Sequence, residues 1–177
     1  MLSRLVMFAL ITTVCLASGG TRNSEEDEFI LHWYRTHPSH KRLAAQKTPH
    51  EWESGAVWHF ATTPLFGHSQ PPNITVRVTK DATQSCSQDV EWKNVWRKLD
   101  LIDPKIPLTP PLSRFGPPIY QVEGRALRIE VNGEVCDAYD SIDGVLTNGE
   151  FRGIRIASGL GAPTEVIGTV RGSFMQP

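Results

Sequence analysis

The residues with the richest chemistry lie between Glu134 and Ile156, in the stretch EVCDAYDSIDGVLTNGEFRGIRI. Asp137, Asp140 and Asp143 recur there at every third position, beside one cysteine. Carboxylates can ligate a metal ion, but a calcium loop of the helix-loop-helix kind needs ligands at alternate positions and a closing glutamate. On a strand, residues three apart point to opposite faces. We therefore expect these aspartates to be structural and assign no metal site.

A turn signal accounts for the first aspartate. Asn132-Gly133 stands between two runs of alternating apolar residues and predicts a two-residue hairpin turn of type I′. With these residues at the turn, Arg128 would lie opposite Asp137 as an ordinary cross-strand ion pair. Asn148-Gly149 repeats the signal, so the C-terminal half is expected to be a meander of hairpins.

Two short motifs resemble catalytic signatures, and each lacks a required residue. The segment 50–54 (HEWES) begins like a zinc-protease helix, but Ser54 stands where the second histidine is needed. The segment 158–161 (SGLG) lacks both the lysine of a phosphate loop and the flanking glycine of a nucleophile elbow. We predict no catalytic residue and no cofactor. A hydrolase with a site assembled from dispersed residues is kept as a third hypothesis.

Three histidines, His32, His37 and His40, lie close together near the N-terminus. Histidine is a common ligand of transition metals. A helix end at Pro38 would separate the three side chains, however, and histidines are common on protein surfaces. We therefore expect solvent-exposed histidines here, with a metal site as the alternative.

Residues 1–19 are typical of a cleaved secretory signal peptide. Arg4 precedes an apolar run that ends in small residues, and this run is too short to cross a membrane. Cys15 could be acylated in a lipoprotein, but the preceding Val14 is larger than that processing usually accepts. We therefore expect a secreted or periplasmic protein without a lipid anchor.

Two cysteines remain after such cleavage, Cys86 and Cys136. In an oxidising compartment an even number favours a disulfide. This bridge would close a loop of about 50 residues and stabilise the fold by roughly 4 kcal/mol. Two separate buried thiols are the alternative. Asn73 opens an Asn-Ile-Thr sequence that is an N-glycosylation acceptor in a eukaryotic host.

The charges of the chain are balanced, with a net charge of −1. Loss of Arg4 leaves 17 Lys and Arg against 19 Asp and Glu, a net charge of −2. A protein that binds nucleic acid or an anionic membrane surface needs a basic face. We therefore expect neither partner, and no further apolar run is long enough for a membrane span.

The spacing of apolar residues predicts the elements of the mature chain. A short amphipathic helix is expected in the polar junction 20–53, before Pro38, and the rest of that junction is expected to be irregular. The single β-rich domain 54–177 should contain strands at 54–63, 74–80, 119–123, 127–131 and 165–174. Asp89–Leu101 shows helical spacing and is predicted as a helix, with a strand through Trp92 as the alternative.

Residues 103–118 contain six prolines and predict a long irregular loop, which is either a binding flap or a spacer. The five tryptophans all lie between residues 33 and 96, and such rings fill a core or line an interface. As candidate binding residues we choose two of these tryptophans and the apolar and basic residues of the loop: Trp92, Trp96, Leu112, Arg114 and Phe115.

Together these features predict a mainly β protein, a small antiparallel barrel or sandwich of about seven or eight strands, with one or two short helices and one disulfide. The first functional hypothesis is a non-catalytic binding protein that engages another protein, most concretely an inhibitor or immunity protein. The alternative is a barrel that holds a small apolar ligand. A filled interior with exposed aromatic residues would favour the first hypothesis, and an internal cavity would favour the second.

Overall fold

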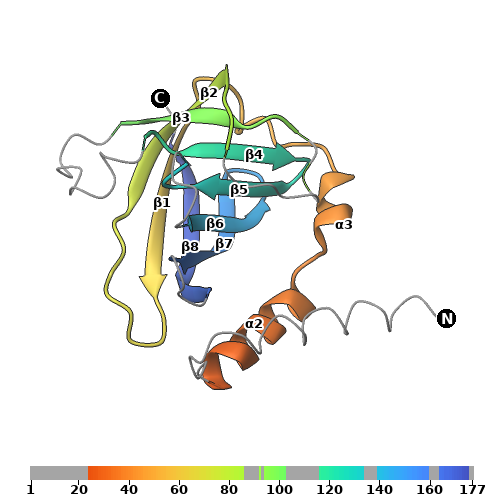
Figure 1. Cartoon of the computed structure of the whole chain (residues 1–177). Helices are drawn as coiled ribbons and strands as arrows, with labels where there is room; N and C mark the ends of the chain where they lie inside the picture. Colours follow the sequence, from red (N-terminus) through yellow and green to blue (C-terminus); the bar gives the residue numbers. More distant parts are fainter. Residues whose placement is uncertain are drawn as a thin grey trace.

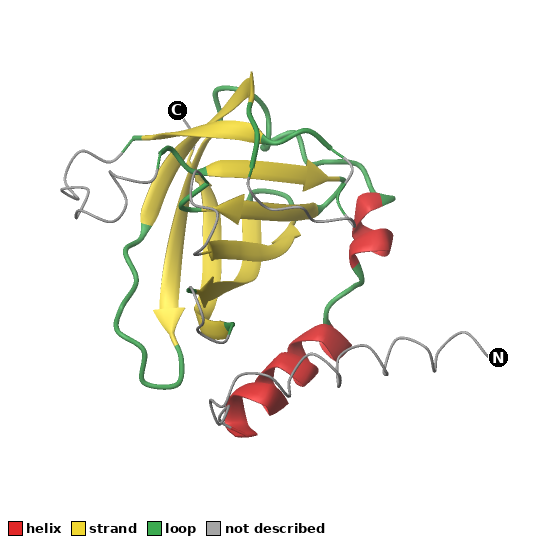
Figure 2. Ribbon diagram, in the orientation of Figure 1, coloured by secondary structure: helices red, strands yellow, loops and turns green. Residues whose placement is uncertain are grey.

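The described residues form a closed barrel of eight antiparallel strands preceded by two helices, as seen in a computed structural model (Figures 1 and 2). The structure describes residues 24–85, 92, 94–102, 116–133, 139–159 and 164–175. Each strand pairs with its neighbours in the sequence, and the first and last strands close the barrel. The predicted β-rich fold is confirmed, and it is a barrel rather than a sandwich.

The helices are α2 (Ser24–Thr36) and α3 (His40–Ala44). The strands are β1 (Val57–Pro64), β2 (Ile74–Ala82), β3 (Arg97–Leu101), β4 (Ile119–Glu123), β5 (Ala126–Glu130), β6 (Tyr139–Leu146), β7 (Glu150–Ser158) and β8 (Glu165–Met175).

The predicted N-terminal helix is confirmed as α2. Three acidic residues in its first turn, Glu25, Glu26 and Asp27, suit the positive end of the helix dipole. The helix ends at Thr36, two residues before Pro38. This end is expected, because a proline disfavours the helical conformation of the residue before it. In Figure 1, α2 lies beside one end of the barrel, near β8, whereas α3 lies against the turn between β4 and β5.

Helix α3 lies in the stretch expected to be irregular, and close packing fixes it to the barrel. Leu43 is buried, and its carbonyl oxygen accepts a hydrogen bond from the Arg125 backbone N–H at 3.1 Å. Gly124 precedes Arg125 with φ of 57°, and a Cβ atom at this position would collide with the backbone carbonyls of α3. Helix α3 therefore packs directly against the β4–β5 turn, and glycine at position 124 permits this close approach.

The interior of the barrel is filled by its own side chains. Alternate residues of each strand point inward and join one apolar cluster. Aromatic rings dominate it: Trp58 and Phe60 of β1, Tyr120 of β4 and Phe151 of β7, with Trp52 closing one end. An eight-stranded barrel has an interior just wide enough to be filled in this way.

The helix predicted at Asp89–Leu101 is wrong where the structure describes it, because Arg97–Leu101 forms strand β3. Leu99 points into the barrel and is fully buried, whereas its neighbours Lys98 and Asp100 are exposed. Val95 belongs to the same apolar stripe but is 58% exposed, so the stripe is not one buried helical face. Pairing with β2 and β4 outweighs the local helical spacing.

The hairpin turn predicted at Asn132-Gly133 is also wrong. Glu130 pairs with Ser141, and Val131 donates its backbone N–H to the Asp140 carbonyl at 2.8 Å, so the connection is longer than two residues. The Asn132 side chain instead accepts a hydrogen bond from the Asp140 N–H at 3.0 Å. In consequence Arg128 lies opposite Asp143.

The second Asn-Gly pair does turn the chain, between β6 and β7, where Leu146 pairs with Phe151. Gly149 has φ of 76°, whereas Asn148 has a negative φ, so this turn is not of type I′ either. Several sequence predictions lie outside the described residues: the predicted signal peptide, both cysteines of the predicted disulfide, Asp137 and residues 103–115 of the proline-rich loop.

Candidate functional site

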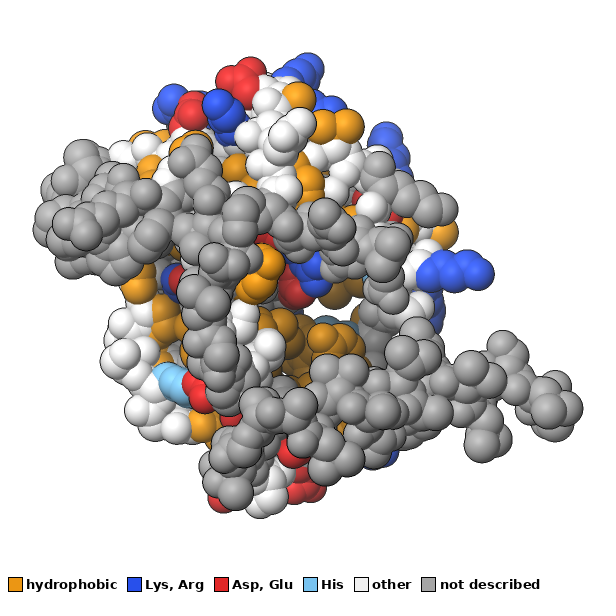
Figure 3. All heavy atoms as spheres, viewed as in Figure 1, with side chains coloured by type: hydrophobic (Ala, Val, Ile, Leu, Met, Phe, Trp, Pro, Cys, Tyr) orange, Lys and Arg blue, Asp and Glu red, His pale blue; other side chains and the backbone are white. Residues whose placement is uncertain are grey.

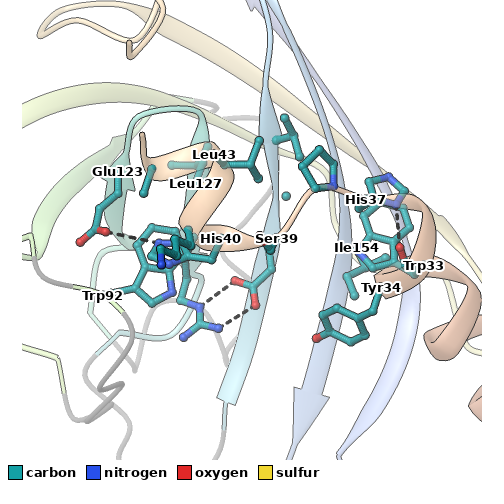
Figure 4. A pocket seen from close by; sticks show the side chains of 17 residues that line it. Trp33, Tyr34, His37, Ser39, His40, Leu43, Trp92, Glu123, Leu127 and Ile154 are labelled. Carbon is teal, nitrogen blue, oxygen red and sulfur yellow. Dashed lines mark hydrogen bonds and ion pairs between the residues drawn. The ribbon is translucent and has the colours of Figure 1, made fainter. Parts of the chain in front are cut away.

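A large hollow of the described structure lies outside the barrel. It has a volume of about 950 Å³ and separates helices α2 and α3 from the outer face of β5, β6 and β7. Hydrophobic side chains line a hollow near the centre of the face in Figure 3. We refer to the hollow of about 950 Å³ as the groove. Figure 4 shows its two groups of side chains, with Glu123, His40 and Trp92 at one end and Trp33, Tyr34 and Ile154 at the other.

The floor of the groove is a row of outward-facing residues across three strands. Arg128 of β5 lies opposite Asp143 of β6, which lies opposite Ile154 of β7. The guanidinium of Arg128 binds both carboxylate oxygens of Asp143, at 2.7 and 2.9 Å. Because both charges of this pair are compensated, a partner could cover them without leaving a buried charge unpaired.

The first end of the groove is built from α3 and the segment before β3. The His40 ring packs against the Trp92 ring with centroids 4.4 Å apart. The Cζ atom of Arg128 lies over the Trp92 ring, 5.5 Å from its centroid. Nε2 of His40 is 3.4 Å from a carboxylate oxygen of Glu123. The Glu123 carboxylate also accepts a hydrogen bond from the Asn94 backbone N–H at 2.8 Å. These contacts hold Trp92 between two cationic or polar groups.

The second end of the groove is built from the last turn of α2. The His37 ring stacks on Trp33 with centroids 3.4 Å apart, and its Nδ1 contacts the Trp33 carbonyl oxygen at 2.9 Å. Tyr34, the next residue, is 66% exposed. Ile154 forms the opposite wall and is almost completely buried although it faces away from the barrel interior. The helix therefore covers apolar wall residues at this end.

A second, smaller hollow of about 270 Å³ continues the groove, because Tyr34, Arg128 and Asp143 line both. Tyr139 and Thr164 lie on its far side. Tyr139 is 37% exposed, so a partly exposed tyrosine lies at each side of the shared ion pair. The combined shape is elongated and open rather than a closed pocket.

A buried arginine inside the barrel is satisfied by the polar groups around it. Arg155 of β7 is only 2% exposed and binds both oxygens of Asp140, at 2.7 and 2.6 Å. Its remaining nitrogen donates to the Pro72 carbonyl at 3.0 Å and contacts the Thr62 hydroxyl at 3.4 Å. This ion pair closes the end of the barrel opposite Trp52 and uses the donors of the guanidinium for structure.

Tyr120 is a buried group of β4 with a displaced titration. Its hydroxyl donates to the Thr79 carbonyl oxygen at 2.8 Å and so links β4 to β2. Desolvation by burial raises the pKa of Tyr120 above its ordinary value of 10.0, and the nearby Arg97 opposes this rise. The group is therefore a neutral structural donor at physiological pH.

Of the binding residues chosen from the sequence, Trp92 lines the groove and Trp96 lies buried outside it. Leu112, Arg114 and Phe115 lie outside the described residues, as do Cys86 and Cys136. Of the described candidates, Trp92 alone lies in the groove. Its neighbours there are residues that were not chosen from the sequence as binding residues. The Oδ1 atom of Asn73, the predicted glycosylation site, accepts a hydrogen bond from the Thr62 N–H at 3.2 Å.

The groove residues missed from the sequence had weak signals. His37 and His40 drew attention only as metal ligands, and the described residues include no group of three or more His, Cys, Asp or Glu side chains able to hold a metal ion. Trp33 and Tyr34 fitted the helical spacing but nothing marked them as a groove wall. Arg128 and Asp143 become partners only through the strand register.

The fold and the groove define a class: an up-and-down eight-stranded barrel with a helical N-terminal extension across its outer wall. No protein-family model matches the sequence, and comparisons with curated proteins and with solved structures also give no match. Among the helices of the described residues, none is long and apolar enough to cross a membrane.

Proposed function

We propose that this protein is an exported, non-catalytic binding protein that engages another protein through the groove, most concretely as an inhibitor or immunity protein. The observation that carries the proposal is the location of the hollow space. The barrel interior is packed with large aromatic side chains, while the hollow of about 950 Å³ lies on the outer wall. A filled barrel serves as a scaffold, and its outer surface is left to make contacts.

The composition of the groove supports a protein partner. Tryptophan, tyrosine and arginine are the residues that contribute most to protein interfaces, and Trp33, Tyr34, Trp92, Tyr139 and Arg128 line the two hollows. The elongated shape suits an extended segment of a partner better than a compact molecule. Arg128 and Asp143 on its floor form an ion pair, so a partner that covers them leaves neither charge unpaired.

An affinity experiment tests the proposal. The mature protein is immobilised and exposed to secretions of the producing organism and its neighbours, beside the double variant Tyr34→Ala/Tyr139→Ala. A matched control, Val95→Ala/Met175→Ala, removes exposed apolar side chains that line neither hollow. We expect one protein to bind stoichiometrically to the wild type and control and at least ~10-fold more weakly to the groove variant, since tyrosine hot spots contribute about 2 kcal/mol or more. Equal binding to all three would overturn the assignment of the groove.

The alternative is a small apolar ligand, and the volume of the groove favours it as a second candidate. Pockets for small molecules range from roughly 300 to 1,000 Å³, and the groove has about 950 Å³. Such a ligand would lie in the groove rather than inside the barrel. Mass spectrometry of the intact protein under native conditions distinguishes the two, because a retained small molecule adds a discrete mass without any protein partner.

The hydrolase hypothesis draws less support from the groove. A general base needs a free acceptor near the reacting atoms, whereas both oxygens of Asp143 are bound by Arg128. His40 approaches Glu123, but its ring is packed between protein groups on α3 and Trp92. Turnover of ester, peptide or glycoside substrates that is lost in the His40→Ala variant would revive this hypothesis.

A further inference from the structure

Two contacts join the N-terminal half of helix α2 to the barrel, a hydrogen bond of Glu26 and a ring contact of Phe29. Oε1 of Glu26 accepts the backbone N–H of Val166 on β8 at 2.7 Å, and Glu26 is 6% exposed although it is an acidic residue on a surface helix. Val166 lies next to the point where the β7–β8 register shifts. A helix carboxylate thus satisfies a strand N–H beside the bulge.

A ring contact forms the second attachment. The rings of Phe29 on α2 and Phe66 pack edge to face, with centroids 5.8 Å apart. Phe66 lies in the connection between β1 and β2. Phe66 has φ of 52°, the only positive value among the described residues other than glycine. A bulky residue adopts this conformation only when surrounding contacts hold it there, so the β1–β2 connection is shaped to present this ring to α2.

The other end of α2 is joined to a fixed point by a short linker. Helix α3 is seated on the β4–β5 turn through Leu43, and residues 37–39 connect it to α2. His37, the residue after the end of α2, stacks on Trp33 of the helix with ring centroids 3.4 Å apart. Between the two ends the helix is separated from the outer wall by the groove. Helix α2 is therefore held at one end by α3 and at the other by the hydrogen bond of Glu26.

We propose that α2 is a hinged strap over the groove, which releases from the barrel as a unit when the contacts of Glu26 and Phe29 break. Release widens the groove and uncovers Ile154 and Val166, two outward-facing side chains that are 1% and 2% exposed. The use of the opening to admit a partner rests on the proposed function. The opening itself is a property of the free protein and can be measured without any partner.

Hydrogen exchange of single amides measures the release in the full mature chain. The Val166 N–H is bonded to the strap, whereas the N–H groups of Val131 and Leu146 donate within the barrel. We expect Val166 to exchange on the order of a hundredfold faster than Val131 and Leu146, because local opening costs less than global unfolding. Equal rates at the three amides would mean that α2 opens only with the barrel and would overturn the proposal.

Thiol labelling supplies a second readout that does not depend on the Glu26 hydrogen bond. In Ile154→Cys the new thiol lies on the outer wall beneath α2, and in Ile142→Cys it lies inside the barrel; both parent side chains are at most 1% exposed. With dithionitrobenzoate, and with the unsubstituted protein as background, we expect the first variant to react at least tenfold faster.

Adding Glu26→Ala should accelerate labelling of Ile154→Cys several-fold and leave Ile142→Cys unchanged. Glu28→Ala removes the same charge from an exposed position of the same helix and should change neither rate. Insensitivity of Ile154→Cys labelling to Glu26→Ala would show that the reagent enters a static groove and would overturn the strap. This outcome differs from failure of the proposed function, which appears as loss of a protein partner in the affinity experiment.

Discussion

Single residues at the two ends of the barrel decide how its interior is closed. Arg155 brings a charge into an apolar barrel and is tolerated because Asp140, Pro72 and Thr62 accept its hydrogen bonds. Tyr120 brings a hydroxyl that reaches a strand two positions away in the sheet. Sequence patterns could place Arg155 on a strand. Its inward orientation depends on the register with Ile142, which the misplaced turn at Asn132-Gly133 obscured.

Asp140→Ala should be strongly destabilising, because it leaves the buried Arg155 guanidinium without its carboxylate. We expect a loss of about 3–5 kcal/mol in the free energy of unfolding, measured by urea denaturation. The control is Glu150→Ala, which breaks the contact with Arg152, a pair whose side chains are 68% and 62% exposed. An exposed pair contributes about 0–1 kcal/mol. Similar losses in both variants would contradict the structural role of Arg155.

Tyr120→Phe should remove the hydrogen bond to the Thr79 carbonyl and cost about 1 kcal/mol at neutral pH. Burial raises the pKa of Tyr120 above 10.0, so the folded protein holds this proton more tightly than the unfolded chain does. Its contribution is therefore complete below the unfolded pKa and is lost as pH rises through the folded pKa. Denaturation at several pH values should show a loss of stability above about pH 10, smaller in Tyr120→Phe than in the wild type. An unchanged pH dependence in this variant would contradict the assignment.

At the scale of elements, strands with clear alternation and the N-terminal helix were predictable from sequence. Ile74, Val76 and Val78 alternate with polar residues and are buried in β2. The errors lie where local pattern and long-range pairing disagree. The segment that ends in β3 has helical spacing, but only the barrel supplies partners on both sides for Leu99. The groove could not be predicted, because it arises between helices and strands far apart in the chain.

Gly124→Ala should dislodge α3, because its Cβ would lie 2.3 Å from the Leu43 carbonyl oxygen. Gly67→Ala is a matched control: Gly67 also has a positive φ, of 77°, but nothing lies within 4 Å of the added atom. The control should lose about 1–2 kcal/mol from backbone strain, and Gly124→Ala at least about 1 kcal/mol more from the collision. Thermal and urea unfolding of both variants gives the comparison. Equal losses would mean that α3 is not seated on the turn.

At the scale of the whole molecule, the barrel is a filled scaffold and the helices create the hollow space. The apolar cluster joins side chains from all eight strands and packs the barrel interior. The helical extension instead crosses the outer wall and leaves the aromatic groove between them. For this reason we place the proposed binding function outside the barrel.

Site-specific photocrosslinking tests this central claim most directly. Benzoylphenylalanine replaces Tyr34 in the groove, Tyr139 in the smaller hollow that continues it, or the 58% exposed Val95 outside both. Each protein is irradiated in the secretions that are expected to contain its partner. The account predicts that the same protein is captured from both groove positions and not from position 95. Capture from position 95 alone, or from all three positions equally, would contradict a binding site in the groove.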